Sequence, residues 1–150
     1  MTNMKEIKYT LRGVSIEQFA TPFVPSSEDF DVNVSIPIKA NYQERAIAIG
    51  ANVQFFAEGR VFLIAEAFCH YQIEPNCWNK LSEDDSKEVV LPKGFINNLA
   101  GIAVSTVRGV LCARTENTPF AKYFLPLIML DPKQGEDVKI AKPQAQKEGE

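Results

Sequence analysis

The run LPKGFINNLAGIAVSTVRGVLCA at residues 91–113 restricts the fold of this chain more than any other part of its sequence. Pro92 suits the first position of a helix, where its missing N–H costs little. Beyond it, apolar residues recur at the three-and-four spacing of one helix face. They are Phe95, Ile96, Leu99, Ile102, Ala103, Val107 and Val110. The spacing predicts one long amphipathic helix, about 30 Å in length at 1.5 Å per residue.

A second side of this predicted helix carries almost no side chains. Gly101, Ser105 and Gly109 follow one another at intervals of four residues. A glycine inside a helix costs roughly 1 kcal/mol relative to alanine, so small residues in register indicate that another backbone packs closely there. We therefore expect two buried faces, one against the chain's own sheet and one against a partner subunit. Arg108 is assigned to that second, intersubunit face.

Strict alternation of apolar and polar residues precedes the helix and predicts antiparallel strands. The clearest case is residues 30–42, whose apolar set is Phe30, Val32, Val34, Ile36, Ile38, Ala40 and Tyr42. Pro37 interrupts the polar set, and because proline cannot donate to a ladder, this strand should lie at an edge or contain a bulge. Residues 5–19 begin as a strand and change phase at Gly13, as expected of a bulge.

Two further strands are predicted at residues 45–57 and 60–73, joined by a tight hairpin turn at Glu58 and Gly59. Each has one apolar face for the core.

The strand at 60–73 also has apolar residues on its second face. Phe62, Ile64 and Phe68 alternate with its core positions, and Phe56 of the preceding strand joins them. Such a face is too apolar to be exposed to solvent alone. Three interpretations stay open: contact with another subunit, contact with a bound polypeptide or ligand, and cover by a loop.

Strands first and one major helix last indicate an α+β domain with an antiparallel sheet. The chain of 150 residues suits a single domain, which we place at residues 1–130. Within it, the spacing of Ser82 and Asp85 resembles a capping box and predicts a short helical turn. Residues 120–130 are apolar but contain a proline, and are expected to be extended and packed on the domain. Residues 131–150 are rich in charge and predict a flexible tail.

The composition excludes several classes of function. A net charge of −3 removes the electrostatic case for a nucleic-acid partner. The start of the chain lacks the apolar core of a signal peptide, and the polar residues Lys93, Asn97 and Arg108 argue against insertion of the long helix into a membrane. Three cysteines without framework spacing point to a reducing compartment, so we expect the protein to be cytoplasmic.

No catalytic or metal site is predicted. The one histidine, His70, shares a strand face with Glu66, but four residues along a strand separate side chains by about 13 Å. Cys69 and His70 point to opposite faces of that strand, and with Cys77 they still lack a fourth ligand for zinc. Phosphate-binding, metalloprotease and serine-hydrolase motifs are absent from the sequence. We therefore expect a binding protein that is not an enzyme and uses no cofactor.

The order of these segments resembles SecB, the bacterial export chaperone, and its relatives attached to toxin–antitoxin systems. KYTLRGVSIEQF resembles the family's first strand, RVFLIAEAFCHYQIE its fourth strand, and LPKGFINNLAGIAVSTVRG its main helix. FLPLIML resembles the apolar segment after that helix. The similarity covers about residues 5–130, and the order of the elements carries it.

This resemblance implies a four-stranded antiparallel sheet followed by one long helix, in subunits that assemble as a dimer or a dimer of dimers. It further implies a holdase that binds unfolded polypeptides without ATP, in grooves lined by apolar and aromatic side chains. The positions that match those linings are Phe19, Phe23, Val24 and Trp78. The tail at 131–150 lacks the family's second amphipathic helix, which argues against docking to the translocation motor. General holdase activity and the guarding of an antitoxin stay open.

A different class of function is an interaction or adaptor protein on the same fold. Its apolar surfaces would be permanently occupied by subunits or partners. Aromatic residues in loops, Phe19, Phe23 and Trp78 among them, can equally be lids on the core.

Overall fold

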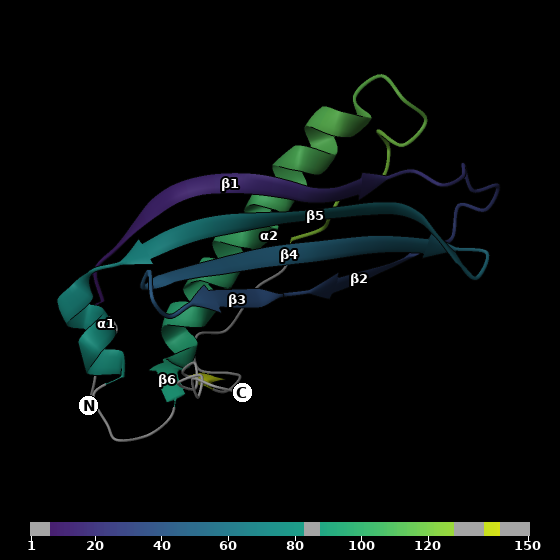
Figure 1. Cartoon of the computed structure of the whole chain (residues 1–150). Helices are drawn as coiled ribbons and strands as arrows, with labels where there is room; N and C mark the ends of the chain where they lie inside the picture. Colours follow the sequence, from purple (N-terminus) through teal and green to yellow (C-terminus); the bar gives the residue numbers. More distant parts are fainter. Residues whose placement is uncertain (1–6, 83–87, 128–136, 142–150) are drawn as a thin grey trace, which may run out of the picture.

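The computed structural model describes residues 7–82, 88–127 and 137–141, and consists of an antiparallel sheet with one long helix across one of its faces (Figure 1). This confirms the predicted α+β class. In chain order the elements are β1 (Tyr9–Ala20), β2 (Asp31–Ser35), β3 (Ile38–Asn41), β4 (Ala46–Ala57), β5 (Arg60–Ile73), α1 (Pro75–Leu81), β6 (Glu88–Leu91), α2 (Lys93–Thr115) and β7 (Val138–Ala141). The main sheet has the order β1-β5-β4-β2, and β3 also pairs with β4.

The strand predicted at 30–42 is broken at Pro37 into β2 and β3. Both pieces pair with β4, so together they fill one edge position of the sheet, as the proline predicted. Between them the Pro37 carbonyl accepts a hydrogen bond from the Gly50 amide at 2.9 Å. The sheet therefore has four strand positions with one of them divided.

The turn between β4 and β5 is the predicted two-residue hairpin. Glu58 and Gly59 have φ angles of 57° and 74°, the left-handed values that suit the twist of such turns. On the far edge, β1 shifts register against β5 twice, between Leu11 and Gly13 and again between Ile16 and Gln18. The first bulge was predicted; the second was not.

A bulge in β5 places Phe62 on the core face of the sheet and not on the predicted second apolar face. Phe55 pairs with Leu63 and Phe56 with Val61, so Phe62 is the extra residue. The bulge lets Phe62 and Leu63 point to the same side, where both are fully buried in the core beneath α2. Phe62 is therefore a core residue and not part of an outer surface.

Phe68 does lie on the sheet face opposite α2, but it is covered within the chain. It packs across Gly50, where an added Cβ would come within 2.9 Å of the ring, and the Lys39 Nζ lies 4.4 Å from the ring centroid. Phe68 is 1% exposed. Its neighbours on this face are mostly polar, namely Ser15, Asn33, Asn52, Gln54, Glu66 and His70. Ile64, which is 8% exposed, and the half-exposed Phe56 also lie on this face. We call it the polar face; of the four apolar residues expected there, Ile64, Phe68 and Phe56 do lie on it, and Phe62 does not.

Helix α2 covers the other face of β4 and β5. It begins at Lys93, one residue later than predicted, and Pro92 is its N-cap. Its buried residues include Phe95, Leu99, Ala103, Val107 and Leu111, whereas Ile102 is 40% exposed. By length and composition alone α2 could cross a membrane, as can many core helices; here its apolar side chains lie on the sheet.

Two connecting segments differ from expectation. Helix α1 ends at Leu81 and Ser82 is its C-cap, so Ser82 closes a helix and does not begin one; Asp85 lies outside the described residues. In the predicted flexible tail, residues 138–141 form β7 and pair with β6. The segment expected to be extended at 120–130 instead begins with turns that reach Lys122. From Tyr123 to Leu127, where the described residues end, it has no regular secondary structure and packs Tyr123 and Leu125 into the core.

Candidate functional site

The exposed large apolar side chains of the described chain gather on the side of the sheet that carries α2. They come from β1, from α2 itself, and from the segments that precede β2 and follow α2. The set is Tyr9, Leu11, Val14, Ile16, Val24, Phe30, Ile102, Phe124 and Leu127. The polar face has no comparable group among the described residues, so any apolar partner would contact the helix side.

Strand β1 supplies the first part of this surface, which we call the β1 strip: Tyr9, Leu11, Val14 and Ile16. Each pairs with a buried residue of β5, so the strip lies on the same face as the core. Helix α2 crosses the sheet obliquely (Figure 1) and makes its main sheet contacts with β4 and β5, whereas β1 is the edge strand. Leu11 and Val14 are consequently 52% and 51% exposed.

The small residues of α2 form the second part. Ser105 and Gly109 are exposed and Gly101 is half-buried. A Cβ added at either glycine would meet nothing within 4 Å, so the described chain packs nothing on this ridge. An open cavity of about 480 Å³ lies beside it, lined by Asn98, Gly101, Ile102, Ser105 and Thr106. A partner subunit on the ridge stays a prediction.

Arg108 has an intrachain role that the sequence did not reveal. Its Nε donates to the Leu125 carbonyl at 3.0 Å, and its Nη2 donates to the Pro126 carbonyl at 2.9 Å. The guanidinium thus ties the segment after α2 to the helix. Two of its five N–H donors are used within the chain, and the assignment of Arg108 to an intersubunit contact stays a prediction.

Replacing Arg108 with alanine should release this segment. Each charged hydrogen bond is worth about 1.5–3 kcal/mol when buried, and because Arg108 is half-exposed we expect a loss near the lower end, about 1–2 kcal/mol in total. Urea unfolding measures the loss, and limited proteolysis should cut faster within 120–127. R114A is the control, because Arg114 is exposed and its guanidinium lies 5.7 Å from the centroid of the Phe19 ring, a contact that does not involve the segment after α2. Equal stability of R108A and the parent chain would contradict the tie.

The segment tied by Arg108 turns alternate side chains outward. Phe120, Tyr123 and Leu125 are buried, whereas Phe124 is 66% and Leu127 is 86% exposed. Two of the most exposed apolar side chains in the described chain are therefore held on a fixed backbone.

An aromatic cluster lies beneath the neighbouring end of the sheet and consists of Phe23, Phe30, Phe55, Phe62 and Tyr123. Its rings pack edge-on, with centroids 4.7 Å apart for Phe62 and Tyr123 and 5.3 Å apart for Phe30 and Tyr123. Phe30 is 41% exposed. The cluster joins the loop before β2 to the segment after α2, and it reaches the surface at Phe30.

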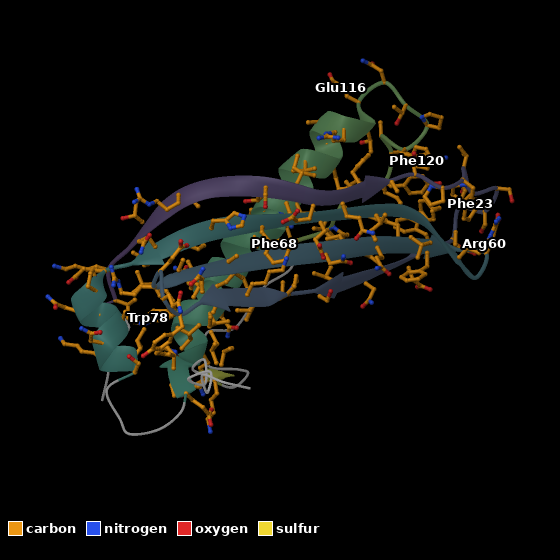
Figure 2. The ribbon with its side chains drawn as sticks, viewed as in Figure 1. Phe23, Arg60, Phe68, Trp78, Glu116 and Phe120 are labelled. Atoms are coloured by element: carbon orange, nitrogen blue, oxygen red, sulfur yellow. The ribbon has the colours of Figure 1, made fainter. Side chains whose placement is uncertain are left out.

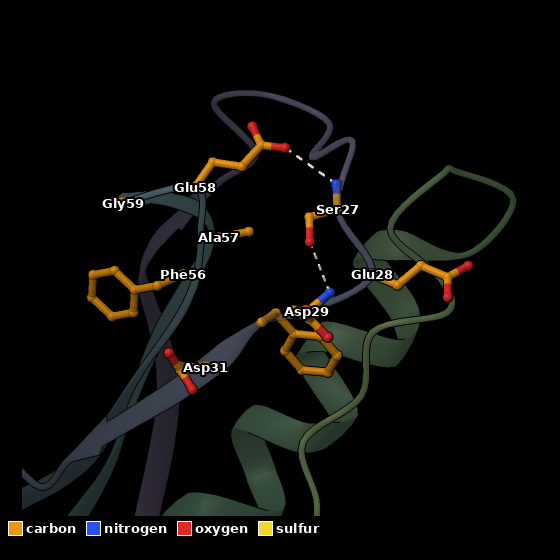
Figure 3. Close-up of a pocket in the computed structure, with 9 residues that line it drawn as sticks. Ser27, Glu28, Asp29, Asp31, Phe56, Ala57, Glu58 and Gly59 are labelled. Atoms are coloured by element: carbon orange, nitrogen blue, oxygen red, sulfur yellow. Dashed lines mark hydrogen bonds between the residues drawn. The ribbon is translucent and has the colours of Figure 1, made fainter.

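The hairpin turn between β4 and β5 fixes the loop that carries Phe23 and Val24. The Glu58 carboxylate accepts hydrogen bonds from the Ser26 hydroxyl and from the Ser26 amide at 2.9 Å. It also accepts one from the Ser27 amide at 3.1 Å (Figure 3). These bonds, the Ser26 hydroxyl first, lower the pKa of Glu58. The Arg60 guanidinium stacks on the Phe23 ring at 3.8 Å. The loop conformation is therefore set by the turn.

The four predicted client-contact residues are not brought together. Phe23 and Trp78 lie at opposite ends of the sheet (Figure 2). Trp78 is 3% exposed and packs on Tyr42 in the core, so it offers no contact surface and acts as a lid. Phe19 and Phe23 are half-buried, and Val24 is 56% exposed. Sequence reasoning missed Phe30, Phe124 and Leu127 as surface positions.

Ser15 and His70 of the described chain do not form the Ser–His–carboxylate arrangement of a catalytic triad. Ser15 Oγ lies 2.7 Å from His70 Nε2, but the nearby carboxylate, Glu17, contacts the serine instead of orienting the histidine. Burial raises the pKa of the Tyr71 phenol, which keeps it protonated and unsuited to act as a base. Across residues 7–82, 88–127 and 137–141, no group of three or more His, Cys, Asp or Glu is placed to hold a metal ion.

Comparison with known proteins gives a likeness in fold only. No protein-family model matches the sequence, and no curated protein matches it. Among solved structures, the chain is similar to a SecB-like chaperone of Mycobacterium tuberculosis bound to an antitoxin peptide, at 14% identity over 80% of this chain and 90% of that chain, with a TM-score of 0.43. It is also similar to a Streptococcus agalactiae protein of unknown function, at 14% identity, 82% and 98% coverage, and a TM-score of 0.43. A SecB-like chaperone is thus among its structural neighbours, as the order of segments predicted.

Proposed function

We propose that this chain is a polypeptide-binding chaperone that holds unfolded segments without ATP and works as a cytoplasmic homo-oligomer. The observation that supports this most is the one-sided distribution of apolar surface. Nearly all the exposed large apolar side chains lie on the helix side, while the polar face is closed. A surface of this kind on a soluble domain marks a contact site for other protein chains.

The β1 strip and the small-residue ridge are the proposed intersubunit contacts. β1 spans 12 residues and has one strand partner, β5, among the described residues. A long apolar edge strand invites pairing with another chain. Pairing of two β1 strands about a twofold axis is self-complementary, because each subunit offers the same patch. The bare ridge of α2 next to it would let a second backbone approach closely.

The proposed client-contact surface runs from the loop before β2, where Val24 and Phe30 are exposed, along the segment after α2, where Phe124 and Leu127 are exposed. Its floor is the buried aromatic cluster, and its two sides are held by Arg108 and by the Glu58–Arg60 turn. An unfolded client gains about 25 cal/mol for each Å² of apolar area that it buries here. Such contacts need neither a nucleotide nor a defined client sequence, and they give breadth in place of specificity.

The test is suppression of aggregation. We expect the purified protein to reduce light scattering by a thermally unfolding model client at a stoichiometric ratio and without nucleotide. A hydrophobic dye separates the alternative adaptor function, because a free client surface takes up the dye and a permanently sealed interface does not. An oligomer that excludes the dye and leaves the client unprotected would refute the chaperone proposal.

Replacing Phe124 and Leu127 with serine should weaken client protection without unfolding the protein. Both side chains are mostly exposed, so their removal costs little stability, but each can lose about 1–2 kcal/mol of client contact. The summed loss of about 2 kcal/mol or more should raise the concentration needed for half-protection about thirtyfold or more. The matched control is A121S/K122S, at exposed positions of the same segment. If the two double variants protect equally, the client surface lies elsewhere.

A further inference from the structure

Strand β6 has as its strand partner a segment from the far end of the chain. Val89 pairs with Ile140 and Leu91 with Val138 in an antiparallel ladder. Val89 and Leu91 are fully buried in the core cluster, and Val138 and Ile140 pack onto that cluster from outside. At the start of β7 the Asp137 carboxylate accepts a hydrogen bond from the Lys93 amide at 2.9 Å. Figure 1 shows β7 beside β6, away from the main sheet.

The attachment of β7 is limited. It consists of four residues in a two-stranded sheet, and such sheets are marginally stable on their own. Val138 and Ile140 stay half-exposed, and the Asp137 hydrogen bond is at the surface. Strand β6, by contrast, is fixed by its buried side chains and by α2, which begins directly after it. Departure of β7 would therefore leave an ordered, unpaired strand edge with an aliphatic surface beside it.

We propose that β6 is a strand-accepting site, that β7 is its internal occupant, and that an extended polypeptide segment with aliphatic residues at alternate positions can replace β7. This inference rests on the proposed function, since the replacing segment would belong to a client. In strand addition the backbone supplies affinity and the alternate side chains supply selectivity. The pair Val138 and Ile140 shows which chemistry fits: two β-branched side chains facing the core and a polar one, Lys139, facing outward.

The apparent affinity of β6 for a competing strand is its intrinsic affinity multiplied by the fraction of molecules in which β7 has left β6. The probe is a fluorescein-labelled peptide that carries the chain's own sequence DVKIA, residues 137–141. We expect V138S/I140S in the full chain to bind this probe about tenfold more tightly than the parent chain does. The matched control is K139S, at an outward position of the same strand, which should bind the probe as the parent does.

A locked variant tests the same point without weakening β7. Val90 and Lys139 are paired across the ladder, so V90C/K139C can form a disulfide at a suitable separation. The exposed Cys112 is removed in the same chain as C112S to prevent mispairing. Oxidised V90C/K139C should lose probe binding at least tenfold, and reduction should restore it.

Backbone amide hydrogen exchange supplies the independent readout. In V138S/I140S the amides of β6 should exchange faster than in the parent chain, and saturating probe should restore their protection. Equal probe affinity in the parent, V138S/I140S and oxidised V90C/K139C would overturn the inference. That result is distinguishable from failure of the chaperone proposal, which is measured by protection of a whole client. A protein that protects clients but ignores the probe retains the proposed function and loses only the β6 site.

Discussion

L11K/I16K should convert the assembled protein into a monomer. Leu11 is 52% and Ile16 is 43% exposed in the single chain, so each leaves about half of its apolar area for a partner, worth about 1 kcal/mol. In a twofold contact both subunits carry the two substitutions, so the interface loses four apolar side chains. The summed loss, about 4 kcal/mol, corresponds to a dissociation constant about a thousandfold higher. Sedimentation equilibrium of both proteins measures the change in mass.

The control for this prediction is T10K/Q18K, which adds the same charges to β1 but on the polar face, where Thr10 pairs with Gln72 and Gln18 with Glu66. T10K/Q18K should keep the mass of the parent assembly. If both double variants dissociate, added charge on either face of β1 disrupts the assembly, and the apolar β1 strip is not the specific contact. A parent chain that is already monomeric at micromolar concentration would exclude the intersubunit contact altogether.

F62A should destabilise the fold by about 3–5 kcal/mol, the usual cost of removing a fully buried phenylalanine. Phe62 is 0% exposed and contacts Phe55, Phe23, Phe30 and Tyr123 in the aromatic cluster. Its removal leaves a cavity where the loop before β2 meets the segment after α2. Urea unfolding followed by far-UV circular dichroism gives the free energy of unfolding.

F56A is the matched control for F62A. Phe56 pairs with Asp31 and with Val61 beside the same bulge, and it is half-exposed. Its truncation should cost less than half as much as that of Phe62. Equal losses at the two positions would mean that the β5 bulge does not turn Phe62 into the core.

The sheet could be predicted from the sequence because its signals are local. Alternation marked each strand, Pro37 marked the divided edge, and Glu58 with Gly59 marked the hairpin. In each case a few neighbouring residues determine the backbone, so a single sequence contains the information. The long helix was predictable for the same reason, from the apolar spacing that ends in Val107 and Val110.

The parts that escaped prediction depend on residues distant in sequence. The β5 bulge moves Phe62 by one position and reverses the side to which it points. The acceptors of Arg108 are backbone carbonyls 17 and 18 residues further along, and carbonyls have no signature in the sequence. Leu11 is exposed because α2 makes its main sheet contacts with β4 and β5. Nothing in the sequence of β1 indicates this.

The tail is an intermediate case. Val138 and Ile140 alternate with Lys139, and this short period-two pattern could have indicated a strand. The charged residues around this pattern predicted a flexible tail instead. A strand of four residues rarely orders unless the edge of another strand is open for pairing. Only the structure shows that β6 provides that edge.

The polar face also limits the size that an assembly can reach. Because Phe68 packs across Gly50 and most of the side chains around it are polar, the exposed large apolar side chains of β1 and α2 lie on the opposite side of the subunit. Two subunits that meet through their helix sides would turn their polar faces outward. Growth would then stop at a closed particle and would not continue into a fibre.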